Sequence, residues 1–209
     1  MQGSDTALFV ACKEGHEEVA KALLAGGADV NAKNTDGATA LFVACKEGHV
    51  EVAQALLATG ADINAPDTHG TNPLTTACEG GHMEVAQVLL ASSADVNAKD
   101  TVRVGQQAGG RFMGQQAGWK DGLVGRDCRA EVAWRLAAES YRDGNTALIL
   151  ACIKGHVELA KLLLAAGADI SAKNTGGEAP CHAASKNGHK DMAKLLKTAF
   201  YGPFTYYHS

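Results

Sequence analysis

The chain has 209 residues, of which 46% are hydrophobic and only 5% aromatic, and its formal net charge is −4. This length suffices for a buried core, and the shortage of aromatic residues predicts that closely packed helices rich in Ala, Leu and Val form it. The mild acidity disfavours a nucleic-acid-binding surface, and no stretch reaches the roughly 20 apolar residues of a membrane-spanning helix.

A unit of 33 residues recurs along the chain. The dipeptide Gly-His returns at steps of 33, 33, 74 and 33 residues, and its glycines are Gly15, Gly48, Gly81, Gly155 and Gly188. A cysteine stands three residues before each of the first four glycines. Residues 6–16 are identical to residues 39–49, which indicates duplication of one unit. We therefore expect five units, with 41 additional residues between the third and the fourth.

Each unit begins with a pattern that is typical of a short helix. In the second unit Thr39 has the hydroxyl that an N-cap needs, and Leu41, Ala44 and Cys45 then fall on one helix face. Gly48 ends this helix, because glycine enters the left-handed backbone region without steric cost. The pattern thus predicts a first helix between Thr39 and Gly48, and equivalent helices in the other units.

A second helix is predicted over residues 50–59 of the same unit, and Gly60 ends it. Its apolar stripe consists of Val52, Ala53, Leu56 and Leu57. The polar segment 61–66 then turns the chain towards the next unit. Isolated helices shorter than about 12 to 15 residues are marginal in water. We therefore expect the units to stack, since only stacking stabilises helices of this length.

The repeated unit resembles the ankyrin repeat, whose 33-residue unit is a turn followed by a helix pair with a T-P-L-H signature. The likeness covers the chain outside the 41 additional residues. It implies an all-α ankyrin-repeat solenoid of stacked helix-turn-helix units with β-turn or hairpin connections.

The units depart from this signature at its Pro and His positions. Phe9, Phe42 and Ile149 stand where the family has His, and only the last unit, with Pro180 and His182, retains both residues. That unit has Ala179 in place of the Thr. The Thr–His hydrogen bonds of the family are therefore not expected, and apolar packing should carry more of the stability.

Three features distinguish the turns and ends of the array. Ser93 replaces a helix-ending glycine, and a non-glycine residue held left-handed costs about 1 to 2 kcal/mol, so this turn should be the loosest. Lys197 replaces a leucine in the last unit and predicts a polar end cap. The first unit has nothing ahead of it to shield Leu8 or Leu23, which suggests a fragment of a longer array or a fraying start.

The additional residues differ in composition from the repeats. They hold all six Arg and both Trp of the chain, and a helix is expected at 127–141. The amino-acid composition changes abruptly at this segment, and the repeat resumes in phase after it. Both observations favour an adventitious insert, such as translated intron sequence. The alternative is a binding arm that uses Arg and Trp, or a nucleic-acid contact. The predicted domains are units 1–3 at 3–101, the insert at 102–142, units 4–5 at 143–200 and an aromatic C-terminal tail at 201–209.

The histidines and cysteines that recur in register do not predict a metal or redox site. Neighbouring helices pack about 8 to 10 Å apart, too far for equivalent side chains to share a zinc ion with ~2 Å bonds or to form a disulfide. We expect small buried cysteines in the first helices and histidines that hold the inter-helix turns. No catalytic, cofactor-binding or metal-binding residue is predicted, and only Cys128 in the insert is expected to be reactive.

A solenoid exposes a long concave surface made of turn tips and first helices. In the family that the chain resembles, this surface binds other proteins, which implies a non-enzymatic interaction scaffold without a cofactor, monomeric and cytoplasmic or nuclear. The alternatives are the recognition module of a larger enzyme or channel and, less favoured, nucleic-acid binding by the insert. Matched unit by unit, the predicted partner-binding row comprises Lys13, Glu14, Thr35, Asp36, Ala38, Lys46, Glu47, Thr68, His69, Thr71, Glu79, Asp143, Asn145, Ile153, Lys154, Glu178, Lys186 and Asn187.

Overall fold

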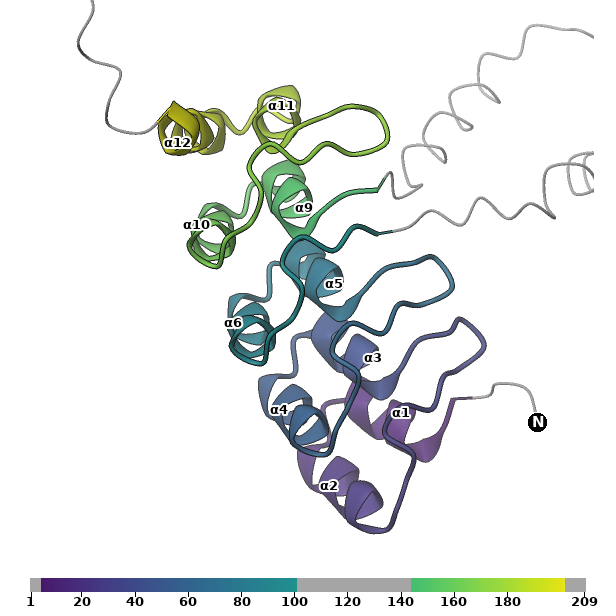
Figure 1. Cartoon of the computed structure of the whole chain (residues 1–209). Helices are drawn as coiled ribbons and strands as arrows, with labels where there is room; N and C mark the ends of the chain where they lie inside the picture. Colours follow the sequence, from purple (N-terminus) through teal and green to yellow (C-terminus); the bar gives the residue numbers. More distant parts are fainter. Residues whose placement is uncertain (1–4, 101–143, 202–209) are drawn as a thin grey trace, which may run out of the picture.

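The chain folds into a stack of helix pairs. The computed structural model describes residues 5–100 and 144–201, and these form ten helices and no strand (Figure 1). The first helices of the pairs are α1 (Ala7–Lys13), α3 (Ala40–Glu47), α5 (Pro73–Gly80), α9 (Ala147–Lys154) and α11 (Pro180–Lys186). The second helices are α2 (Glu17–Ala25), α4 (Val50–Ala58), α6 (Met83–Ala91), α10 (Val157–Ala165) and α12 (Lys190–Tyr201). The predicted all-α solenoid is confirmed for this part of the chain.

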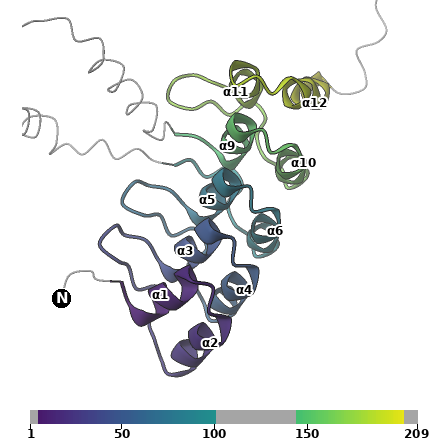
Figure 2. The same cartoon turned by 180° about the vertical axis from the view of Figure 1, so that it is seen from behind.

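The two kinds of helix form two layers. α1, α3, α5, α9 and α11 pack in one row, each against the next, and α2, α4, α6 and α10 pack in a second row behind them (Figures 1 and 2). The loops that join consecutive pairs project beyond the row of first helices (Figure 1). One side of the stack is therefore lined by loops and first helices. None of the helices in the two described ranges is long and apolar enough to cross a membrane.

Side-chain and glycine caps set the ends of the first helices. The Phe42 amide donates a hydrogen bond to Thr39 Oγ1 over 3.2 Å, and Gly48 ends α3 in the left-handed region with φ of 82°. Asn72 takes the place of the threonine in the third unit and forms a capping box with Thr75. The predictions of a Thr39 cap and a Gly48 stop are confirmed.

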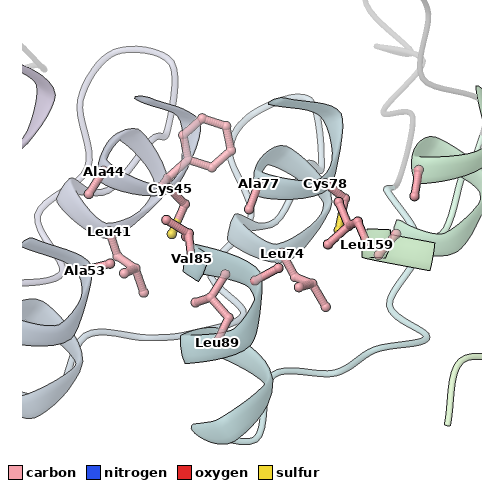
Figure 3. Close-up of a cluster of buried hydrophobic side chains, with 14 of the residues drawn as sticks. Leu41, Ala44, Cys45, Ala53, Leu74, Ala77, Cys78, Val85, Leu89 and Leu159 are labelled. Carbon is pink, nitrogen blue, oxygen red and sulfur yellow. The ribbon is translucent and has the colours of Figure 1, made fainter. Parts of the chain in front are cut away.

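Small aliphatic side chains form the core between the two layers. Leu74 of α5 and Val85 and Leu89 of α6 are almost completely buried, in one cluster with Leu41 of α3 (Figure 3). Burial of such a side chain stabilises the fold by about 1.5 to 3 kcal/mol. Because the cluster joins helices of successive pairs, stacking supplies the stability that the short helices lack.

The first unit is better covered than its sequence suggests. Nothing ahead of this unit was expected to shield Leu8, but the side chain is only 2% exposed because α1 packs on α2 and α3, which follow it in the chain. Leu23 is half-buried against the same core. The large apolar side chains that this unit leaves exposed are instead Val10 and Val19, at 46% and 51%.

Glycines and histidines of adjacent units pack against each other along one edge of the stack. A Cβ atom placed on Gly48 would lie 2.6 Å from Nδ1 of His82, and one placed on Gly15 would lie 2.6 Å from Cε1 of His49. His82 Nε2 donates to the carbonyl oxygen of Lys46 over 2.9 Å. The histidines therefore hold the end of the preceding first helix, as predicted, and the glycines leave room for their rings.

The stack continues from the third pair to the fourth although residues 101–143 separate them in the sequence. α9 packs on α5, and α10 packs on α6. Asn97 Oδ1 accepts a hydrogen bond from the Asp169 amide over 2.8 Å, and the same bond joins Asn31 to Asp62 in the first two units. The expectation that the fourth unit docks in spite of the additional residues is therefore confirmed.

Several predictions concern residues outside the described ranges. The insert at 102–142, its expected helix at 127–141 and Cys128 lie there, as does most of the tail. Tyr201, predicted to begin that tail, belongs instead to α12. Neither glycine nor proline interrupts residues 190–201, so the sequence pattern allows α12 to extend to Tyr201.

The turn after α6 holds the only non-glycine residue with positive φ in the described part of the chain. Ser93 lies at φ 69°, which confirms its predicted left-handed conformation. Ser93→Gly should raise the free energy of unfolding by about 1 kcal/mol, because glycine removes the steric penalty. Urea denaturation measures this change, with the adjacent Ser92→Gly, at φ −93°, as the matched control. Equal effects of the two substitutions would contradict strain at Ser93.

Candidate partner-binding groove

A groove of about 780 Å³ lies over the first three units, on the side lined by loops and first helices. Its buried lining residues, which we call the floor, are Phe9, Ala38, Phe42, Val43 and Thr76. The ends of the first helices supply a helix wall of Lys13, Lys46, Glu47, Glu79 and Gly80. The segments before these helices supply a loop wall of Asp5, Asn34, Thr35, Asp36, Asp67 and His69. The groove thus combines a largely apolar floor with polar walls.

Hydrogen bonds within and between the loops hold the loop wall in place. Asn34 Oδ1 accepts from the amides of Asp36 and Ala38, over 3.0 and 2.9 Å. The Asp36 carbonyl oxygen accepts from the amide and the hydroxyl of Thr68, over 2.8 and 2.9 Å. Because each of these loops is bonded to the next, the backbone at Asp36 is positioned before a partner arrives.

The two lysines of the helix wall are anchored through their backbone. The carbonyl oxygens of Lys13 and Lys46 accept from the rings of His49 and His82, over 3.0 and 2.9 Å. The lysine side chains are exposed, and neither forms an ion pair with another described residue. The helix wall therefore presents side chains that can move on a backbone that is fixed.

The groove carries an excess of negative charge, with five carboxylates against two lysines. Asp5 accepts from Asn34 Nδ2 over 3.0 Å, and Asp67 Oδ1 accepts two backbone amides of its own loop. Asp36 and Glu47, by contrast, are exposed and form no ion pair within the part of the chain that the structure describes. These two carboxylates are available to a cation from outside.

One floor residue has a hydrogen-bonding group that the described chain does not use. Thr76 is 4% exposed, and its buried hydroxyl has no hydrogen-bond partner among the described residues. Val43 and Leu150 occupy the equivalent positions of the second and fourth units. A buried polar group without a partner costs about 1 to 3 kcal/mol, so a ligand that bonded to Thr76 would remove this cost.

The structure brings the predicted row together only in the first three units. Its members that line the groove are Lys13, Thr35, Asp36, Ala38, Lys46, Glu47, His69 and Glu79. Glu14 and Thr68 are exposed without lining it. In the last two units, Lys154 and Asn187 are exposed, Ile153 is half-buried, and Glu178 forms an ion pair with Lys186 at 2.7 Å. These residues lie outside the groove, and Asp143 lies outside the described ranges.

Three members of the predicted row, Ala38, Thr71 and Asn145, are buried, so the expectation that they are exposed is wrong. Each stands directly before the N-cap of a first helix, where the chain enters the stack. Asn145 Oδ1, for example, accepts from Asn174 Nδ2 in the loop of the next unit over 3.0 Å. The side chain of Asn145 therefore joins two neighbouring loops, and Ala38, although buried, still lines the groove.

Most of the floor was not predicted from the sequence, because its residues are buried and binding residues were expected at exposed positions. The signals that could have found the floor are departures from the repeat. Phe9 and Phe42 stand where the related family has His, and Thr76 is polar where the other units have Val, Leu or Ala. Asp67 was also not predicted. The sequence signal for it is an aspartate at the start of a turn, a position from which its carboxylate accepts backbone amides of its own loop.

The four cysteines in register are buried free thiols, as predicted for the first helices. Burial raises the pKa of Cys12 to about 11 and the pKa of Cys78 to about 12. A thiol with such a pKa is almost fully protonated at neutral pH and is a poor nucleophile. Within residues 5–100 and 144–201, no three His, Cys, Asp or Glu side chains converge as metal ligands would. These thiols act as small apolar side chains of the core.

Comparison with known protein families identifies the repeat. A family model described as ankyrin repeats (3 copies) matches residues 8–100 and 124–202. The second of these ranges begins inside the predicted insert at 102–142. The match covers most of the chain, including all the described helix pairs.

Several curated proteins share individual stretches of the chain. The Notch-regulated ankyrin repeat-containing protein of Xenopus tropicalis is 43% identical over 56 residues, which are 27% of this chain and 49% of that protein. Protein phosphatase 1 regulatory subunit 12A of Mus musculus is 40% identical over 55 residues, 26% of this chain and 5% of that protein. Potassium channel AKT3 of Oryza sativa subsp. japonica is 42% identical over 57 residues, 27% of this chain and 6% of that protein. The matched segments span less than half of each relative.

Proposed function

Because the chain belongs to the ankyrin-repeat family, we propose that it is a non-enzymatic scaffold that binds a protein partner in the groove of its first three units. It acts as a monomer in the cytoplasm or nucleus and uses no cofactor. The observation that carries this proposal is the groove of about 780 Å³, with its floor of largely apolar side chains and its polar walls.

The construction of the groove suits the binding of a polypeptide segment. The loop wall is already bonded in place, so little conformational entropy is lost when a partner docks against it. The floor offers apolar contact to the partner's side chains, while the exposed lysines and carboxylates of the walls select among partners by charge. Exposed members of the predicted row outside the groove, such as Lys154 and Asn187, contribute secondary contacts to a longer partner.

Quantitative pull-down from a cell lysate tests this assignment. Lys46→Ala/Glu47→Ala should deplete the proteins captured by the unmodified chain and leave its urea unfolding curve nearly unchanged, because both side chains are exposed. Glu158→Ala/Lys161→Ala removes the same two charges from exposed positions of α10, in the second-helix layer and outside the groove, and serves as the matched control. Equal capture by the two double variants, or a lower unfolding midpoint for the first, would refute the groove assignment.

A second candidate function is that of a recognition module within a larger enzyme or channel. It is favoured by the relatives that are a phosphatase regulatory subunit and a potassium channel, in which the matched stretch is 5% and 6% of the whole protein. The complete coding sequence distinguishes the two candidates. The remaining alternative, nucleic-acid binding by the insert at 102–142, is tested by a salt-dependent mobility-shift assay on that segment.

A further inference from the structure

The groove favours one class of protein segment over others. We propose that its partner is an extended, basic segment whose arginine side chains meet Asp36 and Glu47 and whose backbone bonds to Thr76. This inference rests on the proposed function and adds the chemistry of the partner to it.

Charge complementarity is the first argument. The groove holds five carboxylates and two lysines, so the net charge that faces a ligand is negative. Asp36 and Glu47 are exposed and are not neutralised by an ion pair with any described residue. A cationic segment is attracted to such a surface, whereas an acidic one is repelled.

The aromatic floor is the second argument, and it favours arginine. Phe9 and Phe42 line the same groove as these carboxylates. A guanidinium group packs on aromatic rings and bonds to carboxylates at the same time, because it is planar, delocalised and only weakly hydrated. Both rings stand where the signature of the related family has His.

The unused hydroxyl of Thr76 is the third argument and is independent of charge. Thr76 lines the floor of the groove, and its buried hydroxyl has no hydrogen-bond partner among the described residues. A hydroxyl can donate to a carbonyl oxygen or accept from an amide, and an extended segment presents both groups along its backbone. A bound backbone would therefore satisfy the one polar side chain of the floor.

Fluorescence anisotropy with synthetic peptides tests the charge preference. The probe is a fluorescein-labelled peptide of about ten residues in which Arg alternates with Ala, a spacing that places the Arg side chains on one face of an extended chain. The comparison peptides carry Glu or Gln in place of Arg. The Arg peptide should bind most tightly, and its affinity should fall as the salt concentration rises. Equal or tighter binding of the Glu or Gln peptide would overturn the inference.

Charge-neutralising variants of the full-length chain locate the binding site. Asp36→Asn/Glu47→Gln should weaken binding of the Arg peptide roughly tenfold at low salt. Glu51→Gln/Glu84→Gln removes the same two charges from exposed positions on the second-helix layer and should leave the affinity nearly unchanged. Similar losses in both double variants would show attraction by net charge alone and would contradict a site in the groove.

Thr76→Val separates a binding role from a structural one. This near-isosteric change should weaken binding of the Arg peptide roughly fivefold, the loss expected for one hydrogen bond. It should at the same time raise the urea midpoint or leave it unchanged, because the hydroxyl has no partner in the free chain. Unchanged peptide affinity would contradict the contact at Thr76.

The two proposals fail in different ways. If Lys46→Ala/Glu47→Ala depletes captured proteins but the Arg peptide shows no preferential binding, the groove binds a partner and the basic-segment inference is wrong. If the double variant captures the same proteins as the unmodified chain, the groove proposal itself is wrong.

Discussion

Leu89→Ala is expected to lower the free energy of unfolding by about 2 to 5 kcal/mol. Leu89 belongs to α6, is fully buried and lies in the cluster shared by the second and third units (Figure 3). Its truncation leaves a cavity whose walls belong to a close-packed stack, so the loss includes a cavity term as well as the transfer free energy. Urea denaturation followed by circular dichroism measures the change.

The neighbouring Leu90 provides the matched control for this substitution. Leu90 lies on the same helix but is only partly buried against the core. Leu90→Ala should therefore cost clearly less than Leu89→Ala, since less apolar area returns to water and any cavity is open to solvent. Equal losses would mean that helix propensity rather than inter-unit packing determines the stability of α6.

Gly48→Ala is expected to cost about 3 kcal/mol, from two separate causes. Gly48 has φ of 82°, and a side chain held in this region costs about 1 to 2 kcal/mol. The new Cβ would also lie 2.6 Å from Nδ1 of His82, so the ring must move away from the Lys46 carbonyl oxygen that it bonds at 2.9 Å. Loss of that hydrogen bond adds about 1 kcal/mol or more. Urea denaturation measures the total.

Gly60→Ala isolates the backbone contribution. Gly60 has φ of 89°, but a Cβ atom there would meet nothing within 4 Å. It should therefore show only the left-handed cost, about 1 to 2 kcal/mol. If Gly48→Ala and Gly60→Ala lowered the free energy of unfolding by the same amount, the Gly–His contact between units would not contribute to stability. The recurrence of this dipeptide would then need another explanation.

The features of the fold that the sequence predicted are those determined within one unit. A period of 33 residues, a hydroxyl at Thr39 and glycines at fixed positions specify where each helix begins and ends through local hydrogen bonds and backbone sterics. Ser93 could be predicted as left-handed for the same reason, because the equivalent turns contain glycine. Such inferences need no knowledge of how units contact one another.

The features that were mispredicted depend on contacts between units. Leu8 was expected to lack a shield on the N-terminal side of its unit, yet it is buried, and its helix α1 packs on α3 of the following unit. Ala38, Thr71 and Asn145 were expected on the surface because they adjoin polar turns, but they are buried where the chain enters the stack. Burial of this kind depends on the angle at which the units stack, which a one-dimensional pattern does not state.

Only the exposed part of the candidate site could be predicted, because its floor also depends on contacts between units. The exposed positions of the first three units, such as Asp36, Lys46 and Glu47, were identified from the register of the repeat. The register of the repeat did not predict that the groove is confined to these units or that Phe42 lies in its floor. Both features depend on how the side chains of successive units pack together. Departures from the repeat were the better guide to the floor.

Native-state amide hydrogen exchange on α5 and α9 tests most directly whether the units form one continuous stack. Because these helices pack together across residues 101–143, their slowest amides should open with the same free energy. Leu148→Ala, which truncates a fully buried side chain of α9, should lower that free energy in both helices. Independent and faster exchange of α9, with α5 unaffected by Leu148→Ala, would contradict a single stack.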